Sequence, residues 1–216
     1  MAHALPNTGT NASQAAIAVT PKGQATRALI LQTAAEVFAE RGYGDTTMAE
    51  LIGRSGMARG AFYFHFASKE QLALAVLQEK QRQWLELVSQ EALDKATGRE
   101  QLRALGPALI QLHRQDPSAY SAARLSRDLG RIPELAHTVR AQMNAWIALI
   151  AGIIRRAQDE SNLPDTLDPD ALAVILVAAT DGLKDLSDIL DSAARARRGF
   201  EQRMQQLIDV VEALID

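Results

Sequence analysis

The feature that most constrains the fold is the segment from Thr46 to Gln71, TTMAELIGRSGMARGAFYFHFASKEQ. Thr47 and Glu50 have the three-residue spacing of a capping box, in which the threonine accepts a free amide proton and the glutamate reaches back to the cap. Gly56 follows, and glycine readily takes the left-handed conformation in which helices often end. The segment therefore predicts a short helix that begins near Thr47 and a tight turn at Gly56.

A second helix is predicted after this turn, over residues 58–66. Phe62 and Phe66 are four residues apart, so they share one helix face that can pack. Arg59 and Tyr63 lie on the other face. A basic and aromatic face of this kind can meet a polyanion, so the two helices together predict a helix-turn-helix that docks into DNA.

Ser68 and Gln71 form a second capping pair, which opens a long helix that we expect to run to about Lys95. At about 1.5 Å per residue, Lys69 and Trp84 lie roughly 22 Å apart along this helix. We expect it to link two domains and to carry movement from one to the other.

The segment RGAFYFHFASKEQL resembles the signature of the tetracycline-repressor (TetR) family, with Gly, a hydrophobic residue, Tyr, any residue, His-Phe and then Lys-Glu-x-Leu. The resemblance implies an all-α fold, with an N-terminal three-helix helix-turn-helix domain followed by a helical ligand-binding and dimerisation domain. The residues that match the family's DNA contacts are Arg59, Gly60 and Phe64, which would face bases; Tyr63, His65 and Lys69, which would contact phosphates; and Arg27, Thr46 and Thr47, which would lie against the DNA backbone.

These residues also have a plainer interpretation. His65 could be a satisfied surface histidine, and Tyr63 and Phe64 could be core residues. Ala58 departs from the family pattern, because many members have Ser or Thr there to cap the helix or touch DNA. Two caps, a turn glycine and a basic-aromatic face within one short segment nevertheless favour DNA binding.

Composition sets the class of protein. The chain has 216 residues, no cysteine and a net charge of −3. We expect a disordered tail over 1–20, a helix-turn-helix domain over 21–67 and a ligand-binding and dimerisation domain over 68–216. The absence of cysteine excludes disulfides and zinc fingers. Without a signal peptide or an apolar run of roughly 18 residues, no membrane contact and a cytoplasmic location are expected.

Neither an enzyme nor a metal or cofactor site is expected. The sequence has no glycine-rich phosphate loop, and its histidines share no motif with a nucleophile or a metal spacing. The N-terminal domain is nearly neutral, so base reading and dimerisation must supplement electrostatics. The expected partners are therefore a double-stranded DNA operator and a second copy of the chain. The four histidines that lack such a motif are His3, His65, His113 and His137.

The rest of the chain predicts helices only. Gly106-Pro107 predicts a kink in one of them. The last two helices have long apolar stripes that include Leu183 and Leu207, and the TetR resemblance implies that both helices pair with those of a second chain as a four-helix interface. The alternative is that they only close the subunit core. Helix starts with a proline or glutamate in the first turn recur at Thr20-Pro21, Asp116-Pro117, Pro133-Glu134 and Asp168-Pro169.

Within the TetR family, the fullest resemblance is to the γ-butyrolactone-receptor branch of actinobacterial regulators. GAFYFHF resembles its GALYFHF or GAVYFHF segment, Ala123-Arg124-Leu125 resembles its ARL, and Trp146 falls where that branch places a ligand-contacting tryptophan. This implies a repressor dimer on a palindromic operator, released by a small neutral effector of the butyrolactone type. An apolar pocket with few polar groups is expected from Trp84, Leu109, Leu125, Met143, Trp146 and Thr180.

Alternatives to this effector remain open. One is a multidrug- or lipid-responsive repressor of the same fold, and another is a DNA binder with no effector. Trp84 and Trp146 could be core residues, since helical aromatic residues usually are. Asp181, Lys184 and Asp188 fall opposite the leucine stripe, so we expect them on a solvated or interface face.

Overall fold

The computed structural model describes residues 20–116, 118–119, 121–160, 163–191 and 196–215. These parts of the chain form α-helices and one π-helix, with no strand among them, so the predicted all-α fold is confirmed. The tail predicted over residues 1–20 lies outside the described residues except for Thr20, and Pro117 of the predicted Asp116-Pro117 start lies outside them too.

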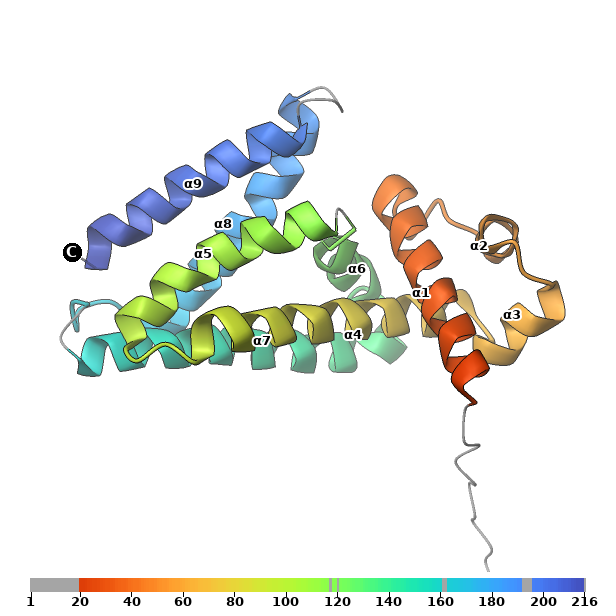
Figure 1. Ribbon diagram of the computed structural model, residues 1–216, viewed down its shortest axis with the longest axis horizontal. Coiled ribbons are helices and arrows are strands. Elements are labelled where there is room, and N and C mark those ends of the chain that lie inside the picture. Colours follow the sequence, from red (N-terminus) through yellow and green to blue (C-terminus); the bar gives the residue numbers. More distant parts are fainter. Residues whose placement is uncertain (1–19, 117, 120, 161–162, 192–195, 216) are drawn as a thin grey trace, which may run out of the picture.

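Three helices form the N-terminal head: α1 (Pro21–Arg41), α2 (Met48–Ser55) and α3 (Arg59–His65). The head lies at one end of the molecule (Figure 1). Thr47 Oγ1 accepts a hydrogen bond from the Glu50 amide at 3.2 Å, and Gly56 ends α2 in the left-handed conformation with φ 65°. The Glu50 carboxylate pairs with Arg41 at 3.2 Å, so only half of the predicted capping box forms.

The long helix α4 (Lys69–Val88) leaves the head, and a π-helical turn, η1 (Ser89–Leu93), follows it directly. Ser68 caps α4 by accepting a hydrogen bond from the Gln71 amide at 3.2 Å. The α-helix stops earlier than the predicted Lys95 because its geometry changes at η1.

The remaining helices form the body of the molecule. Thr97 and Glu100 make the reciprocal capping box at the start of α5, a signal that the sequence carries but that was not among the predictions. Pro107 lies inside α5, which continues through it as one helix. The body helices are α5 (Gly98–Gln115), α6 (Ser121–Leu129), α7 (Pro133–Asp159), α8 (Pro169–Leu190) and α9 (Ala196–Ile215).

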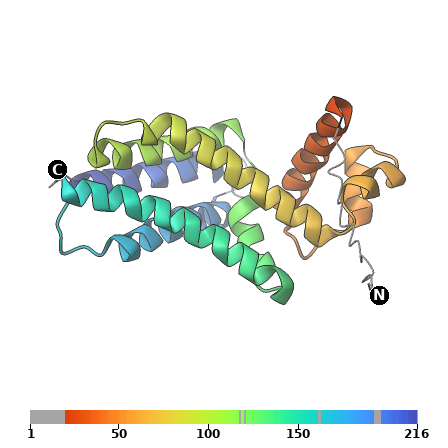
Figure 2. The same cartoon turned by 90° about the horizontal axis from the view of Figure 1, so that it is seen from below.

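Two large apolar cores divide the chain, and α4 contributes to both. Leu72 and Leu77, from its first half, pack with α1–α3 and with Leu129 of α6. Val88 at its end packs with α5, α7 and α8. The helix therefore bridges the head and the body, which lie one after the other along the long axis (Figure 2). No helix in the described ranges is long and apolar enough to cross a membrane.

One close approach fixes how α5 meets α7. A Cβ atom added to Gly98 would lie 2.4 Å from the Ala157 backbone nitrogen and 2.8 Å from its Cα. Such distances are far inside van der Waals contact, so only glycine lets the two backbones come this close. The Gly98 amide also donates a hydrogen bond to Glu160 Oε2 at 2.7 Å.

Candidate DNA-binding face and effector cavity

Helix α3 separates a packed face from an exposed one. Phe62 is 1% exposed and belongs to the core of the head, as does Phe66. Phe64 is 75% exposed, and Tyr63 beside it is also exposed. Exposing large aromatic side chains to water is unfavourable, so an exposed pair on a short helix indicates a surface that can bind a partner.

Two arginines of the head are engaged with carboxylates. Arg41 pairs with Glu50 at 3.2 Å, and Arg54 pairs with Glu40 at 3.0 Å. Both pairs are largely exposed, so they contribute little to stability. They do reduce the positive charge that these two arginines offer to DNA.

Arg27 and Arg59 make no ion pair within the part of the chain that the structure describes. Their guanidinium carbons lie 5.3 Å from the centroid of the Phe66 ring and 5.6 Å from that of Tyr63, respectively. An arginine over a ring face keeps its charge and its N–H donors while losing some freedom of movement. Both residues predicted to contact DNA are thus available to a phosphate or a base.

Lys69 lies inward of this surface. Its ammonium donates hydrogen bonds to the carbonyl oxygens of Tyr43 and Thr46, both at 2.9 Å, and lies 4.1 Å from the Tyr43 ring centroid. It therefore holds the loop between α1 and α2. An ammonium has three donors, so one remains for a phosphate.

The two threonines at the start of α2 differ in position. The Thr46 side chain is buried, and its hydroxyl donates to the Gly42 carbonyl at 2.7 Å. This geometry gives Thr46 a structural role, which corrects the expectation that it lies against DNA. Thr47 is exposed at the helix cap, and His65 is half-buried with its ring edge-on to Phe64 at 5.3 Å.

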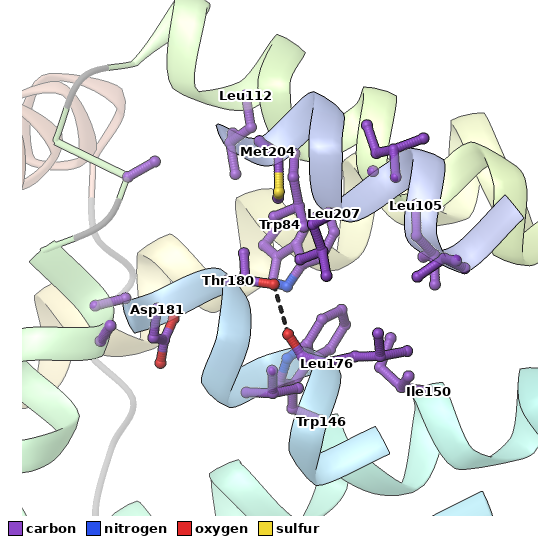
Figure 3. A pocket seen from close by; sticks show the side chains of 18 of the residues that line it. Trp84, Leu105, Leu112, Trp146, Ile150, Leu176, Thr180, Asp181, Met204 and Leu207 are labelled. Atoms are coloured by element: carbon purple, nitrogen blue, oxygen red, sulfur yellow. Dashed lines mark hydrogen bonds between the residues drawn. The ribbon is translucent and has the colours of Figure 1, made fainter. Parts of the chain in front are cut away.

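A cavity of about 170 Å³ lies in the body between α4, α5, α6, α7, α8 and α9. Trp84 from α4 and Trp146 from α7 point into it, with ring centroids 4.6 Å apart and Thr180 of α8 beside them (Figure 3). The Thr180 hydroxyl donates to the Leu176 carbonyl at 2.7 Å. The structure brings five of the six predicted pocket residues together: Trp84, Leu109, Met143, Trp146 and Thr180.

Leu125 is the exception, and its predicted role in the pocket is wrong. It is fully buried in the core shared by the head and α4, not in the cavity. Helix α6 instead presents the small residues Ala123 and Ser126 to the cavity. Successive side chains on a helix differ in direction by about 100°. Neighbouring residues of α6 can therefore face the core of the head or the cavity.

Asp181 lines the cavity beside Thr180, which corrects its expected place on a solvated or interface face. Burial raises the pKa of the Asp181 carboxyl to about 6, against the lowering effect of the Arg127 guanidinium on α6. The sequence does carry a signal, since Asp181 is the one charged residue between Ala171 and Leu183. Lys184 and Asp188 pair with each other further along α8.

A buried ion pair at the cavity wall was missed by sequence reasoning. The Lys80 ammonium, 5% exposed, bonds to the Asp116 carboxylate. Asp116 also accepts hydrogen bonds from the Ser118 amide at 2.9 Å and from its hydroxyl at 2.6 Å. The pair joins α4 to the end of α5, and no local spacing relates two residues 36 positions apart.

Helix α6 contacts both the cavity and the head. Its Arg124 donates a hydrogen bond to the Ala39 carbonyl at 3.1 Å, in the last turn of α1. Ala123 and Ser126 line the cavity from the same helix. Helix α6 therefore connects the cavity wall to the end of α1.

Comparisons with known proteins agree with this architecture. Residues 30–76 match the family described as bacterial regulatory proteins, tetR family, and residues 129–202 match the tetracyclin repressor-like C-terminal domain. The crystal structure of TylP, a TetR regulator from Streptomyces fradiae, is 34% identical over 87% of this chain and 87% of that one, with a TM-score of 0.65. The chain belongs to the TetR family.

Two further relatives have names that describe different roles. A γ-butyrolactone receptor (ArpA-like protein) is 29% identical over 85% of this chain and 97% of its own, with a TM-score of 0.63. The fatty acid metabolism regulator protein of Bacillus subtilis is 24% identical over 139 residues, which are 64% of this chain and 71% of that protein. As a TetR protein, this chain is a DNA-binding transcriptional regulator and not an enzyme.

Proposed function

We propose that this TetR regulator represses transcription as a homodimer on a palindromic operator and is released by a small effector of the γ-butyrolactone type. The observation that supports an effector is the cavity, which is mostly apolar and is lined by both tryptophans of the chain. The 29% identity to a γ-butyrolactone receptor supports this effector class. A DNA binder with no effector would have no use for such a cavity.

A lipid-responsive regulator is the second candidate. It is favoured by the leucine and isoleucine side chains that line the cavity and by the similarity to the fatty acid metabolism regulator. A multidrug regulator would use the same wall. All three candidate regulators share the fold and the proposed mode of DNA binding, so only the identity of the effector distinguishes them.

We infer that α3 enters the major groove and that α2 lies across the DNA backbone, as in other helix-turn-helix proteins. The exposed aromatic pair and the two unpaired arginines support this arrangement. The buried Thr46 side chain is left out of the contacts. The proposed contacts are Arg27, Thr47, Arg59, Gly60, Tyr63, Phe64, His65 and Lys69.

Gly60→Ala should separate DNA contact from folding. A Cβ atom at Gly60 would meet nothing within 4 Å, so the variant should be as stable as the wild type or up to about 1 kcal/mol more stable. The added methyl would stand between α3 and the bases, and we expect operator affinity to fall roughly tenfold, or about 1.4 kcal/mol. Fluorescence anisotropy on DNA from upstream of the gene measures this.

Gly53→Ala is the matched control, because Gly53 lies exposed on α2 and its added Cβ would also meet nothing within 4 Å. It should bind the operator as the wild type does. Equal affinity of the two variants would remove Gly60 from the proposed interface.

Trp146→Ala tests the effector. The variant should bind the operator normally, because Trp146 packs against the core of the body and not that of the head. It should respond poorly to a γ-butyrolactone that bears a hydroxylated alkyl chain, since the ring wall is lost. A hundredfold loss of operator affinity requires a ligand preference of about 2.7 kcal/mol for the released state, and we expect most of that to disappear. Operator release is measured against lactone concentration.

The comparison ligands for this titration are a fatty acid and a hydrophobic cation. Release of the wild type by the fatty acid but not by the lactone would replace the butyrolactone proposal with the lipid one. Release by the cation alone would replace it with the multidrug one.

A further inference from the structure

Asp181 is an acceptor without a partner in an apolar wall. Among the residues that the structure describes, its carboxylate makes no hydrogen bond and no ion pair. The neighbouring Thr180 hydroxyl is already used on the Leu176 carbonyl. In Figure 3, Asp181 lies at the side of the cavity away from Leu105 and Ile150. That side therefore offers a hydrogen-bond acceptor that no described protein group uses.

The guanidinium of Arg127, which acts on the Asp181 charge, is already paired with another carboxylate. Arg127 on α6 bonds to Asp185 at 2.5 Å, one turn beyond Asp181 on α8. Burial raises the pKa of Asp181 to about 6, because the surroundings disfavour the charged carboxylate. A ligand donor that reached it would relieve this cost.

The other charged groups of the wall do not favour an anionic ligand. Lys80 is buried against Asp116, whose carboxylate is further held by Ser118. Arg103 already has an interaction within the protein, and Glu212 of α9 adds a second acidic residue to the lining. A carboxylate ligand would thus find acidic groups where it needs a free cation.

We propose that Asp181 is the group that selects the effector: an apolar molecule whose polar end donates a hydrogen bond, as a hydroxyl or a protonated amine does, and that is not a carboxylate. This inference rests on the proposed effector function and narrows its chemistry. A lactone ring only accepts hydrogen bonds, so a lactone effector satisfies Asp181 through a hydroxyl or another donor that it carries besides the ring. Free fatty acids are disfavoured.

The size of the cavity determines which small molecules can serve as binding probes. About 170 Å³ gives room for roughly a dozen non-hydrogen atoms, at roughly 10 to 15 Å³ for each water-sized group. n-Decylamine, n-decanol, decanoate and γ-decalactone are all close to this size and differ mainly in the polar end. The first two donate hydrogen bonds, and the last two only accept them at neutral pH.

Tryptophan fluorescence reports binding directly, because the chain has 2 tryptophans and both line the cavity. We expect decylamine and decanol to bind the full-length protein roughly tenfold to a hundredfold more tightly than decanoate, with γ-decalactone weaker than decanol. In Asp181→Asn, the ratio of decylamine to decanoate affinity should fall below about threefold.

Asp188→Asn is the control, since it removes the same charge from an exposed position of α8 that does not line the cavity. It should keep the wild-type selectivity. Decanoate binding as tightly as decylamine, selectivity unchanged in Asp181→Asn, or no binding of any probe would each overturn the proposal. The titration needs no DNA, so a failure of operator release by bound probes would refute the proposed function and leave this result standing.

Discussion

Replacing Ile175 and Ile189 together with glutamate is expected to turn the protein into a monomer and to weaken operator binding at least a hundredfold. The two side chains are 60% and 77% exposed on the outer side of α8, where they form part of an apolar surface that a single chain leaves uncovered. Two heads held in one dimer bind two half-sites with an advantage of roughly 10² to 10⁴, which a monomer loses. Other exposed hydrophobic residues of these two helices are Val174, Leu186 and Leu190 on α8 and Val210 on α9.

Sedimentation equilibrium gives the oligomeric state, and anisotropy on the operator gives the affinity. Leu85→Glu is the control, because Leu85 is a 47% exposed hydrophobic residue on α4, away from α8 and α9. That variant should stay dimeric. A double variant that sediments as a dimer would place the interface elsewhere.

Gly98→Ala should be the most destabilising of the conservative substitutions. The new methyl would lie 2.4 Å from the Ala157 nitrogen, and a helix backbone cannot move aside as a side chain can. Pushing α5 from α7 should cost about 3 kcal/mol and lower the melting temperature by roughly 10 °C. Thermal unfolding at one fixed protein concentration measures this, since dimerisation would shift the transition.

Gly152→Ala is its matched control on α7, where an added Cβ would meet nothing within 4 Å. This variant should be as stable as the wild type or up to about 1 kcal/mol more stable. If both alanine variants melted at the same temperature, the close packing of α5 on α7 would not hold in solution.

The head could be predicted from the sequence because its signals are local. The caps at Thr47 and Ser68 and the turn at Gly56 each depend on residues a few positions apart, and the structure has all three. The family resemblance and the apolar pattern together predicted five residues that line the cavity. Even locally, the prediction of a full box at Thr47 was wrong, because Arg41 competes for the Glu50 carboxylate.

The sequence could not predict which core or interface an apolar helix stripe faces. Leu183 and Leu207 lie on the expected apolar stripes, but they pack inside the subunit against the cluster of Phe200, Met204 and Ile208. Helical periodicity gives a stripe without saying whether it faces its own subunit or a second one. Long-range partners decide such cases.

The Arg124 hydrogen bond to Ala39 adds a polar contact to the apolar packing that joins the head to α6. The backbone joins α3 to α4 through residues 66–68, and the hydrogen bond joins the end of α1 to α6. The apolar core that the head shares with the first half of α4 and with Leu129 of α6 lies between these two connections, so both helices constrain the orientation of the head. In the proposed dimer, a shift of α6 would therefore change the orientation of each head and with it the distance between the two recognition helices.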